Sequence, residues 1–485
     1  MIIIMAVSLY TTRIILATLG VTDFGIYNVV ASFVIMFGFL NSALTASTQR
    51  FITFELGKTG EQELKKVFSI SIIIHGALAL LVFVLAQTVG LWFLNTQMSI
   101  PLERMEAAFW VFQFAVFSTM VGIVKVPYNA MVIAHEHMSF FAYMSILEVV
   151  LKLLSAYLLV VVVYDKLVAY SAFVFFTVLM IFGFYFLYNK KHYASARFAI
   201  LWDRALAKEM FSFSGWSLFG GFAWMLMNHG VNIMLNIFFG PAVNAARGIA
   251  MQVNAAIASL VNSFRMAVNP QIIKMYGAEN SGGMKHLSLL SARYTFYLAL
   301  ILILPLYLEI ETVLNIWLVG VPEWTVEFCQ LILIITLIQT FDLSFAIIFQ
   351  AMGDIRLNQI LSGMTYVFVL PLGYLLIDFY KLPPTAVFYV QIAAVVTVSF
   401  FVKTYLLRKV AKIPVTFLLT QVFFPISKVI CVIIAFSYLL YMGNQNIIFN
   451  IISSILAVVI SVICLDMERS MREKLFSIIK DKIRR

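Results

Sequence analysis

Long apolar stretches, separated by short polar breaks, follow one another along the whole chain. A stretch of about 18 or more apolar residues is long enough to cross a bilayer as an α-helix. The short alternating strands of a membrane β-barrel are absent from the pattern, and backbone polar groups in hydrocarbon must pair within their own segment, so only helices fit. The pattern predicts fourteen spanning helices, at residues 1–20, 26–49, 67–90, 107–124, 139–163, 168–188, 211–238, 243–264, 290–308, 326–349, 358–377, 384–405, 415–441 and 446–465.

The composition agrees with this reading. Of the 485 residues, 62% are hydrophobic and 12% are charged, whereas a soluble domain carries about 25% charged residues. We therefore predict an all-α polytopic membrane protein. The three cysteines lie singly, with no metal or disulfide spacing. We expect no catalytic or metal site and no cofactor.

The basic residues orient the helices. With a cytoplasmic N-terminus, 25 Lys and Arg, Lys403 among them, fall in inside loops and helix ends, and only Arg104, Lys166, Arg247 and Lys381 fall outside. This asymmetry follows the positive-inside rule and predicts two cytoplasmic termini. The net charge of +10 is thus a topology signal, and we expect no nucleic-acid partner. The basic tail, residues 466–485, is expected to lie on anionic membrane lipids.

The chain also contains an internal repeat. A shift of 220 residues places Gly20 on Gly240 and Gly57 on Gly277, with long helices of similar character between them. Such a parallel repeat predicts two six-helix bundles around a central cavity, followed by two extra helices. The predicted segments are residues 1–190, 211–405, 415–465 and the tail 466–485.

Two stretches of this repeat carry a family resemblance. The first stretch contains LGVTDFGIYNVV, FLNSALTASTQRF and ELGK, and the second contains GPAVNAARGIAMQV and NPQIIKMYG. Together they resemble the polysaccharide-transporter branch of the multidrug/oligosaccharidyl-lipid/polysaccharide (MOP) exporter superfamily, the O-antigen-type flippases. The resemblance implies a bacterial inner-membrane protein, functional as a monomer. It also implies a substrate, lipid-linked oligosaccharide on undecaprenyl pyrophosphate, moved from the cytoplasmic to the outer leaflet. The missing polar N-terminus departs from the family pattern and leaves the first helix open.

Polar residues form stripes on three predicted helices. At about 100° per residue, each stripe spans roughly 80° of arc or less. Polar groups facing lipid are costly, so the stripes should face protein or water. Either they line the cavity, or their side chains join helices by hydrogen bonds. The stripes contain Ser42, Thr45 and Gln49, then Asn228, Asn232 and Asn236, and then Asn254, Asn262 and Asn269 together with two arginines.

Arginines inside spans indicate an anionic substrate. A guanidinium in a membrane is costly unless it reaches water, a headgroup or an anion, and its planar fork matches phosphate oxygens. We expect Arg50 and Arg265 to meet the pyrophosphate near the cytoplasmic side, and Arg13 and Arg247 nearer the outer side. The alternative for Arg50 and Arg265 is snorkelling to the inner headgroups.

The acidic residues within spans are few. Glu148 and Lys152 lie four residues apart and are expected to neutralise each other. Asp342 has no partner close in sequence and could titrate to couple transport to a proton or sodium ion.

Three functions can be compared with the charges and loops of this sequence. A flippase for lipid-linked oligosaccharide fits the cavity arginines best. A cation-coupled multidrug antiporter of the same fold would need an acidic cavity for cationic substrates, so the sign of the charges disfavours it. A membrane glycosyltransferase would need catalytic carboxylates on a substantial loop, and the loops are too short, so we do not expect an enzyme.

Overall fold

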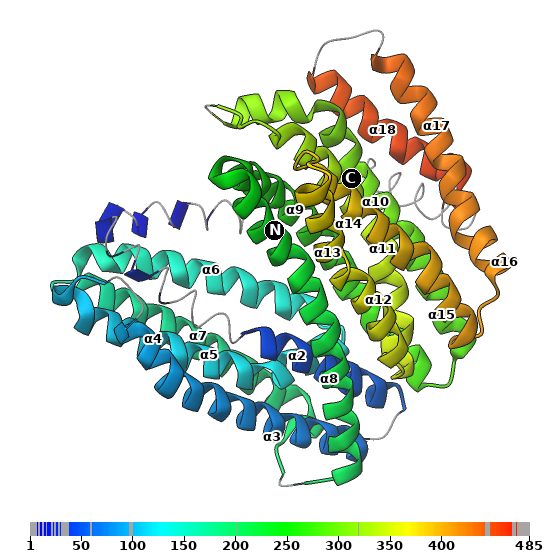
Figure 1. The fold of residues 1–485 in the computed structure, drawn as a ribbon. Coiled ribbons are helices and arrows are strands. Elements are labelled where there is room, and N and C mark those ends of the chain that lie inside the picture. Colours follow the sequence, from blue (N-terminus) through cyan, green and yellow to red (C-terminus); the bar gives the residue numbers. More distant parts are fainter. Residues whose placement is uncertain are drawn as a thin grey trace, which may run out of the picture. The chain divides into compact units, whose positions relative to one another are not determined.

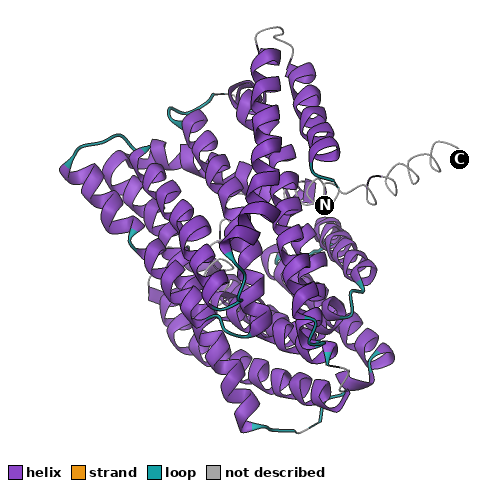
Figure 2. Ribbon diagram, turned by 90° about the vertical axis from the view of Figure 1, so that its right-hand side faces the viewer, coloured by secondary structure: helices purple, strands orange, loops and turns teal. Residues whose placement is uncertain are grey.

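The protein is described by a computed structural model. The described part comprises residues 38–58, 61–96, 100–199, 201–318, 320–441, 447–467 and 472, with residues 7, 10–11, 14–15, 17–20, 23, 26–27 and 30. Within these residues all regular structure is helical and no strand occurs (Figure 2). This confirms the predicted all-α membrane fold.

The chain divides into two compact units. Unit 1 comprises Met1–Leu218 and Tyr276–Glu279, and unit 2 comprises Phe219–Met275 and Asn280–Arg485. The chain therefore passes from one unit to the other three times. The boundaries of the four predicted segments remain a prediction.

Unit 1 is a bundle in which α5 packs against α2, α3 and α7 (Figure 1). Its core near one end of α5 is formed by Val111, Phe112 and Val116, which are fully buried. Its elements are α2 (Gly38–Gly57), α3 (Glu61–Leu85), the π-helical turn η1 (Ala86–Gly90), α4 (Leu91–Thr96), η2 (Leu102–Arg104), α5 (Met105–Ala134), α6 (Met138–Val161), α7 (Lys166–His192), η3 (Ala194–Ala196) and the first part of α8 (Arg204–Met225).

Unit 2 contains the rest of α8, helix α9 except its last two residues, and all later helices. They are η4 (Leu226–Gly230), α9 (Val231–Gly277), α10 (Ser281–Trp317), α11 (Thr325–Met352), α12 (Arg356–Val367), α13 (Val369–Tyr374), η5 (Leu375–Phe379), α14 (Ala386–Val396), η6 (Thr397–Val402), α15 (Lys403–Lys409), α16 (Val415–Leu418), η7 (Leu419–Phe423), α17 (Phe424–Tyr441) and α18 (Ile447–Leu465).

The last two helices, α17 and α18, lie side by side in unit 2 (Figure 1). Helix α18 packs along α10. Two polar contacts connect α10 to this part of the chain. Arg293 forms a buried ion pair of 2.9 Å with Asp466, directly after α18, and the Asn450 amide donates to Glu309 at 2.7 Å.

Eleven helices of the described part are long and apolar enough to cross a membrane. They coincide with eleven of the fourteen predicted spans, so the chain is a multi-pass membrane protein. The predicted spans 1–20 and 26–49 fall largely outside the described residues. The third, 243–264, lies within α9, which is not among the eleven and carries a polar stripe along its length.

Local sequence explains several helix ends. The Asp165 carboxylate accepts the amides of Leu167 and Val168 at the start of α7, and the Asn280 side chain accepts the amide of Gly283 at the start of α10. Both are side-chain caps for otherwise unpaired amides. Helix α11 ends at Gly353, whose φ of 77° is the left-handed conformation in which glycine costs least.

The repeat glycines have matching backbone geometry. Gly20 has a φ of 77° and Gly240 a φ of 80°, and Gly240 forms the one kink in α9. The other pair meets within unit 1. A Cβ added to Gly277 would lie 2.3 Å from the carbonyl oxygen of Phe54 and 3.3 Å from the Cα of Gly57. Equivalent positions of the repeat thus pack backbone to backbone, and a side chain at Gly277 has no room.

Candidate functional site

Arg50 lies in the second half of α2 and is 4% exposed. Its guanidinium is 3.7 Å from the Glu209 carboxylate on α8. It also lies 4.4 Å from the ring centre of Phe51, 4.6 Å from that of Phe54 and 5.9 Å from that of Phe213. An aromatic face attracts a guanidinium through its quadrupole. The acid of Glu209 and these aromatic rings therefore help to hold Arg50 inside unit 1.

Arg247 lies on α9, seven residues after the kink at Gly240, and is 2% exposed. Its Nη2 donates to the main-chain oxygen of Asn228 at 2.9 Å, and its guanidinium lies 5.7 Å from the ring centre of Phe388. The accepting carbonyl belongs to the π-helical turn η4. Such turns relax the regular bonding of the helix and are frequent at functional sites.

One nitrogen of the Arg247 guanidinium has no acceptor in the described part of the chain. Its Nη1 is buried without a hydrogen-bond acceptor there, and no carboxylate pairs with it among the described ion pairs. A buried N–H group without an acceptor costs about 1–3 kcal/mol. Arg247 is a buried cation with donor capacity to spare.

Arg265 follows Arg247 on the same helix. Its Nη1 donates to the Asn262 side chain at 3.2 Å and its Nη2 to the main-chain oxygen of Leu343 at 3.0 Å. Eighteen residues of α-helix make five full turns, so Arg247 and Arg265 lie on one face of α9, about 27 Å apart along its axis. That separation is close to the thickness of the hydrocarbon core, about 30 Å.

Asp342, on α11, has a partner that its local sequence did not reveal. Lys403, at the start of α15, places its Nζ 2.7 Å from Asp342 Oδ1 and also donates to the Asn358 side-chain oxygen on α12. The Tyr366 hydroxyl donates to Asp342 Oδ2 at 2.6 Å. Lys403 is 1% exposed and Asp342 8%. Sequence reasoning missed this cluster, because Lys403 ends an apolar run and was counted as a cytoplasmic flank.

The remaining residues of the predicted stripes are placed as follows. Asn254 accepts the Thr336 hydroxyl at 2.6 Å, which is the helix-joining role, and the Asn228 amide donates to the Trp224 carbonyl of its own helix at 3.0 Å. Thr45, Gln49, Asn232 and Asn269 are half-buried. The side chains of Ser42 and Asn236, and Arg13 as a whole, lie outside the described residues.

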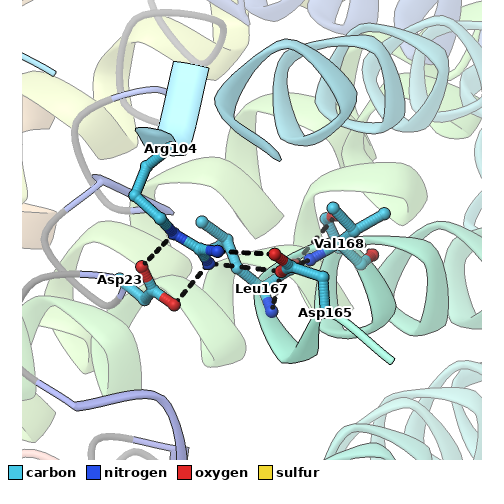
Figure 3. Close-up of polar contacts among 6 residues, drawn as sticks. Asp23, Arg104, Asp165, Leu167 and Val168 are labelled. Carbon is cyan, nitrogen blue, oxygen red and sulfur yellow. Dashed lines mark hydrogen bonds and ion pairs between the residues drawn. The ribbon is translucent and has the colours of Figure 1, made fainter. Parts of the chain in front are cut away.

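A further charged cluster lies in unit 1 at the start of α5 and α7, and sequence reasoning did not foresee it. Figure 3 shows the Arg104 guanidinium between two carboxylates, with bonds of 2.9 and 2.5 Å to Asp23 and of 2.5 and 3.2 Å to Asp165. Partial burial opposes ionisation of Asp165, but the hydrogen bonds from Arg104 and from two amides outweigh it and lower the pKa of this carboxyl. The cluster ties three segments of the bundle together.

No group of three or more His, Cys, Asp or Glu side chains in the described residues could hold a metal ion. The polar groups described above include arginines, amides and hydroxyls. Such groups bind anions and sugar hydroxyls by charge and hydrogen bonding.

The chain resembles known proteins in fold and in sequence. The crystal structure of MATE in the straight conformation superposes with a TM-score of 0.72 at 13% identity, over 85% of this chain and 95% of that one. An outward-facing multidrug resistance MATE family transporter of the MOP superfamily gives 0.70 at 14%, over 84% and 93%. A MOP superfamily transporter from Pyrococcus furiosus, described as having a binding pocket of reversed polarity, gives 0.70 at 14%, over 84% and 93%.

No curated protein matches the chain. The family model described as polysaccharide biosynthesis protein matches residues 1–276. Because this match covers more than half of the chain, and because the fold is that of the MOP exporters, the resemblance expected from the sequence is confirmed. The chain belongs to the polysaccharide biosynthesis protein family and has the fold of the MOP transporters.

Proposed function

We propose that the chain is a flippase that moves undecaprenyl-pyrophosphate-linked oligosaccharide, a repeat unit of O-antigen, capsule or exopolysaccharide, from the inner to the outer leaflet by alternating access. The polysaccharide biosynthesis family supports a glycan substrate, and the fold supports transport. Short loops between the helices leave no room for a soluble catalytic domain.

The proposal rests mainly on the burial of Arg247 and on its donor that has no acceptor in the described part of the chain. A guanidinium this deeply buried, with no carboxylate among its described contacts, is costly in a membrane protein. An anionic ligand would offset that cost, because charge-assisted bonds to a phosphate are stronger than neutral ones and can be bidentate. Nη1 of Arg247, which has no acceptor in the described part of the chain, would donate to a phosphate oxygen.

Arg265 extends the argument along α9. A pyrophosphate cannot cross hydrocarbon unaided, so its charge needs partners at more than one depth. Arg247 and Arg265 share one face of α9 at separated depths, which would let each hold the pyrophosphate at one stage of transport. Arg50 would act at the cytoplasmic side if Glu209, an exposed acid, released it to the phosphate. Arg13 is retained as a predicted outer-side contact.

The alternative is a cation-coupled multidrug antiporter of the same fold. A cationic drug would need unpaired acids, yet Asp342 is paired with Lys403 in unit 2. Arg247, a buried charge with spare bonding capacity, has the opposite sign. We therefore prefer an anionic substrate.

The test is to delete the gene and follow lipid-linked glycan by extraction and mass spectrometry. We expect undecaprenyl-pyrophosphate-linked oligosaccharide to accumulate on the cytoplasmic side and the surface glycan to disappear, with both restored by the wild-type gene. Normal glycan export together with increased sensitivity to cationic drugs would instead establish the antiporter.

A further inference from the structure

A buried cluster of polar side chains surrounds Lys403 in unit 2. The Lys403 ammonium is surrounded by ligands that a free cation would take. It contacts the Asp342 carboxylate at 2.7 Å and the Asn358 side-chain oxygen, and it lies 5.7 Å from the ring centre of Phe349. Carboxylate and amide oxygens are the usual ligands of hard metal cations, and a lysine ammonium is a compact point charge of similar character.

Helix α12 offers a further oxygen at the same place. Asn358, Ser362 and Tyr366 are spaced by four residues and share one face of this helix. Asn358 binds Lys403 and Tyr366 binds Asp342, so Ser362 lies between two members of the cluster. The Ser362 hydroxyl is buried and has no hydrogen-bond partner in the described part of the chain. A buried hydroxyl usually finds a partner, so the Ser362 oxygen is free to act as a further ligand for a cation.

The charge of the cluster selects the class of cation. Asp342 supplies one negative charge, and Tyr366, Asn358 and Ser362 are neutral ligands. A monovalent cation would neutralise this set, whereas a divalent cation would leave one positive charge buried, which is costly. The other cation nearby, Arg265 on α9, already donates to the Leu343 carbonyl and the Asn262 side chain.

We propose that the Lys403 ammonium is a built-in cation in a site made for a monovalent metal ion such as Na⁺ or K⁺, formed by Asp342, Asn358 and Ser362. With Lys403 in place, no free ion is needed to neutralise Asp342. Removing the ammonium leaves a buried carboxylate uncompensated, which is strongly destabilising, and makes the site available to a free ion. The proposal is independent of the flippase function, because it is tested by stability and not by transport.

The experiment measures the melting temperature of the purified full chain at pH 8 in NaCl, KCl and choline chloride of equal concentration. Wild-type protein should melt at the same temperature in all three. Lys403→Ala should melt lower in choline chloride and recover with increasing NaCl or KCl in a saturable way, since a ligand of the folded state alone stabilises it. The recovery should vanish in the double variant Lys403→Ala/Asp342→Asn.

A matched control is the Lys152 and Glu148 pair on α6, which has the same distance of 2.7 Å but is much more exposed. Lys152→Ala should show no dependence on the identity of the cation. If Lys403→Ala is too unstable to purify, Lys403→Gln removes the charge while keeping most of the side-chain volume.

Several outcomes would overturn the proposal. Equal melting of Lys403→Ala in all salts would make Lys403 a structural partner only. Stabilisation by lower pH without dependence on Na⁺ or K⁺ would show that a proton replaces the ammonium. A wild-type protein stabilised by Na⁺ through Asp342 would show that the site is not filled. Failure of both variants to fold in NaCl and in KCl would show that no free ion substitutes.

Discussion

Replacing Arg247 tests whether this arginine serves ligand binding or the stability of the fold. Methionine has a similar length and is apolar, so Arg247→Met removes the charge with little change in packing. The main-chain oxygen of Asn228 keeps a second donor after the change, because the amide of Val231 also donates to it. The substitution therefore strands no acceptor.

The expected change in stability can be worked out from these contacts. Losing the charged hydrogen bond to Asn228 costs about 1.5–3 kcal/mol, and removing the buried Nη1 that has no acceptor in the described structure regains about 1–3 kcal/mol. The two effects oppose each other and are similar in size. We expect the free energy of unfolding to change by no more than about 2 kcal/mol in either direction.

The effect on ligand binding should be much larger. A pyrophosphate that loses one charge-assisted bond loses about 1.5–3 kcal/mol, which corresponds to roughly 10-fold to 100-fold in affinity. Arg247→Lys keeps the charge but loses the fork, so its affinity should be intermediate.

The assay pairs melting of the purified variant with titration of a soluble isoprenyl pyrophosphate, and with complementation of a deletion strain. The matched control is Arg293→Met, another buried arginine of unit 2. It leaves Asp466 buried without its cation, so it should lose about 3–5 kcal/mol of stability. The reasoning about Arg247 is refuted if Arg247→Met is destabilised as much as Arg293→Met and still binds pyrophosphate with unchanged affinity.

Three more predictions follow from contacts within unit 1. Gly277→Ala should destabilise the protein by about 1–3 kcal/mol, since its methyl group overlaps a backbone carbonyl. Gly282 has open space around it, so Gly282→Ala should melt like wild type. Equal melting temperatures of the two variants would contradict the steric explanation. Arg50→Lys should complement a deletion strain only in part at normal protein level, and full activity would identify Arg50 as a topological anchor. Because the folded pKa of Asp165 is lowered, its contribution to stability is complete above its ordinary pKa of about 3.9 and is lost as the pH falls below that value. Melting of wild type and Asp165→Asn should therefore differ at pH 7, and the difference should shrink as the pH falls from the ordinary pKa through the lowered folded pKa. A difference that stays constant with pH would refute the linkage.

Much of the fold could be predicted from the sequence, because membrane helices carry their signal locally. An apolar run and its polar ends identify a span without knowledge of any other span. The repeat was equally visible, since Gly20 and Gly240 sit at positions where the backbone takes a positive φ, and few residues other than glycine tolerate that conformation.

The partners of charged residues could not be predicted in the same way. Arg247 stood out because a cation inside an apolar run is unusual, but the acceptor on Asn228 depends on a π-helical turn that leaves no clear pattern. Lys403 and Asp342 lie on different helices, and only packing brings them together. Arg104 was counted as an outer loop residue, although it binds two acids from separate segments. Contacts between helices depend on how the helices pack, and the spacing of residues along one helix does not show this.

The three crossings of the chain between the units have an evolutionary consequence. Unit 1 includes the first turns of α8, which supply Glu209 to Arg50, and the short segment that supplies Gly277 to the end of α2. In the predicted repeat, the span of α8 opens the second copy, and Gly277 lies at the end of its next long helix. If the gene were split between the two copies, the protein encoded by its first half would lack Glu209 and Gly277, which pack within unit 1. Once two such copies are fused, neither can be lost or transferred alone, and the duplication becomes irreversible.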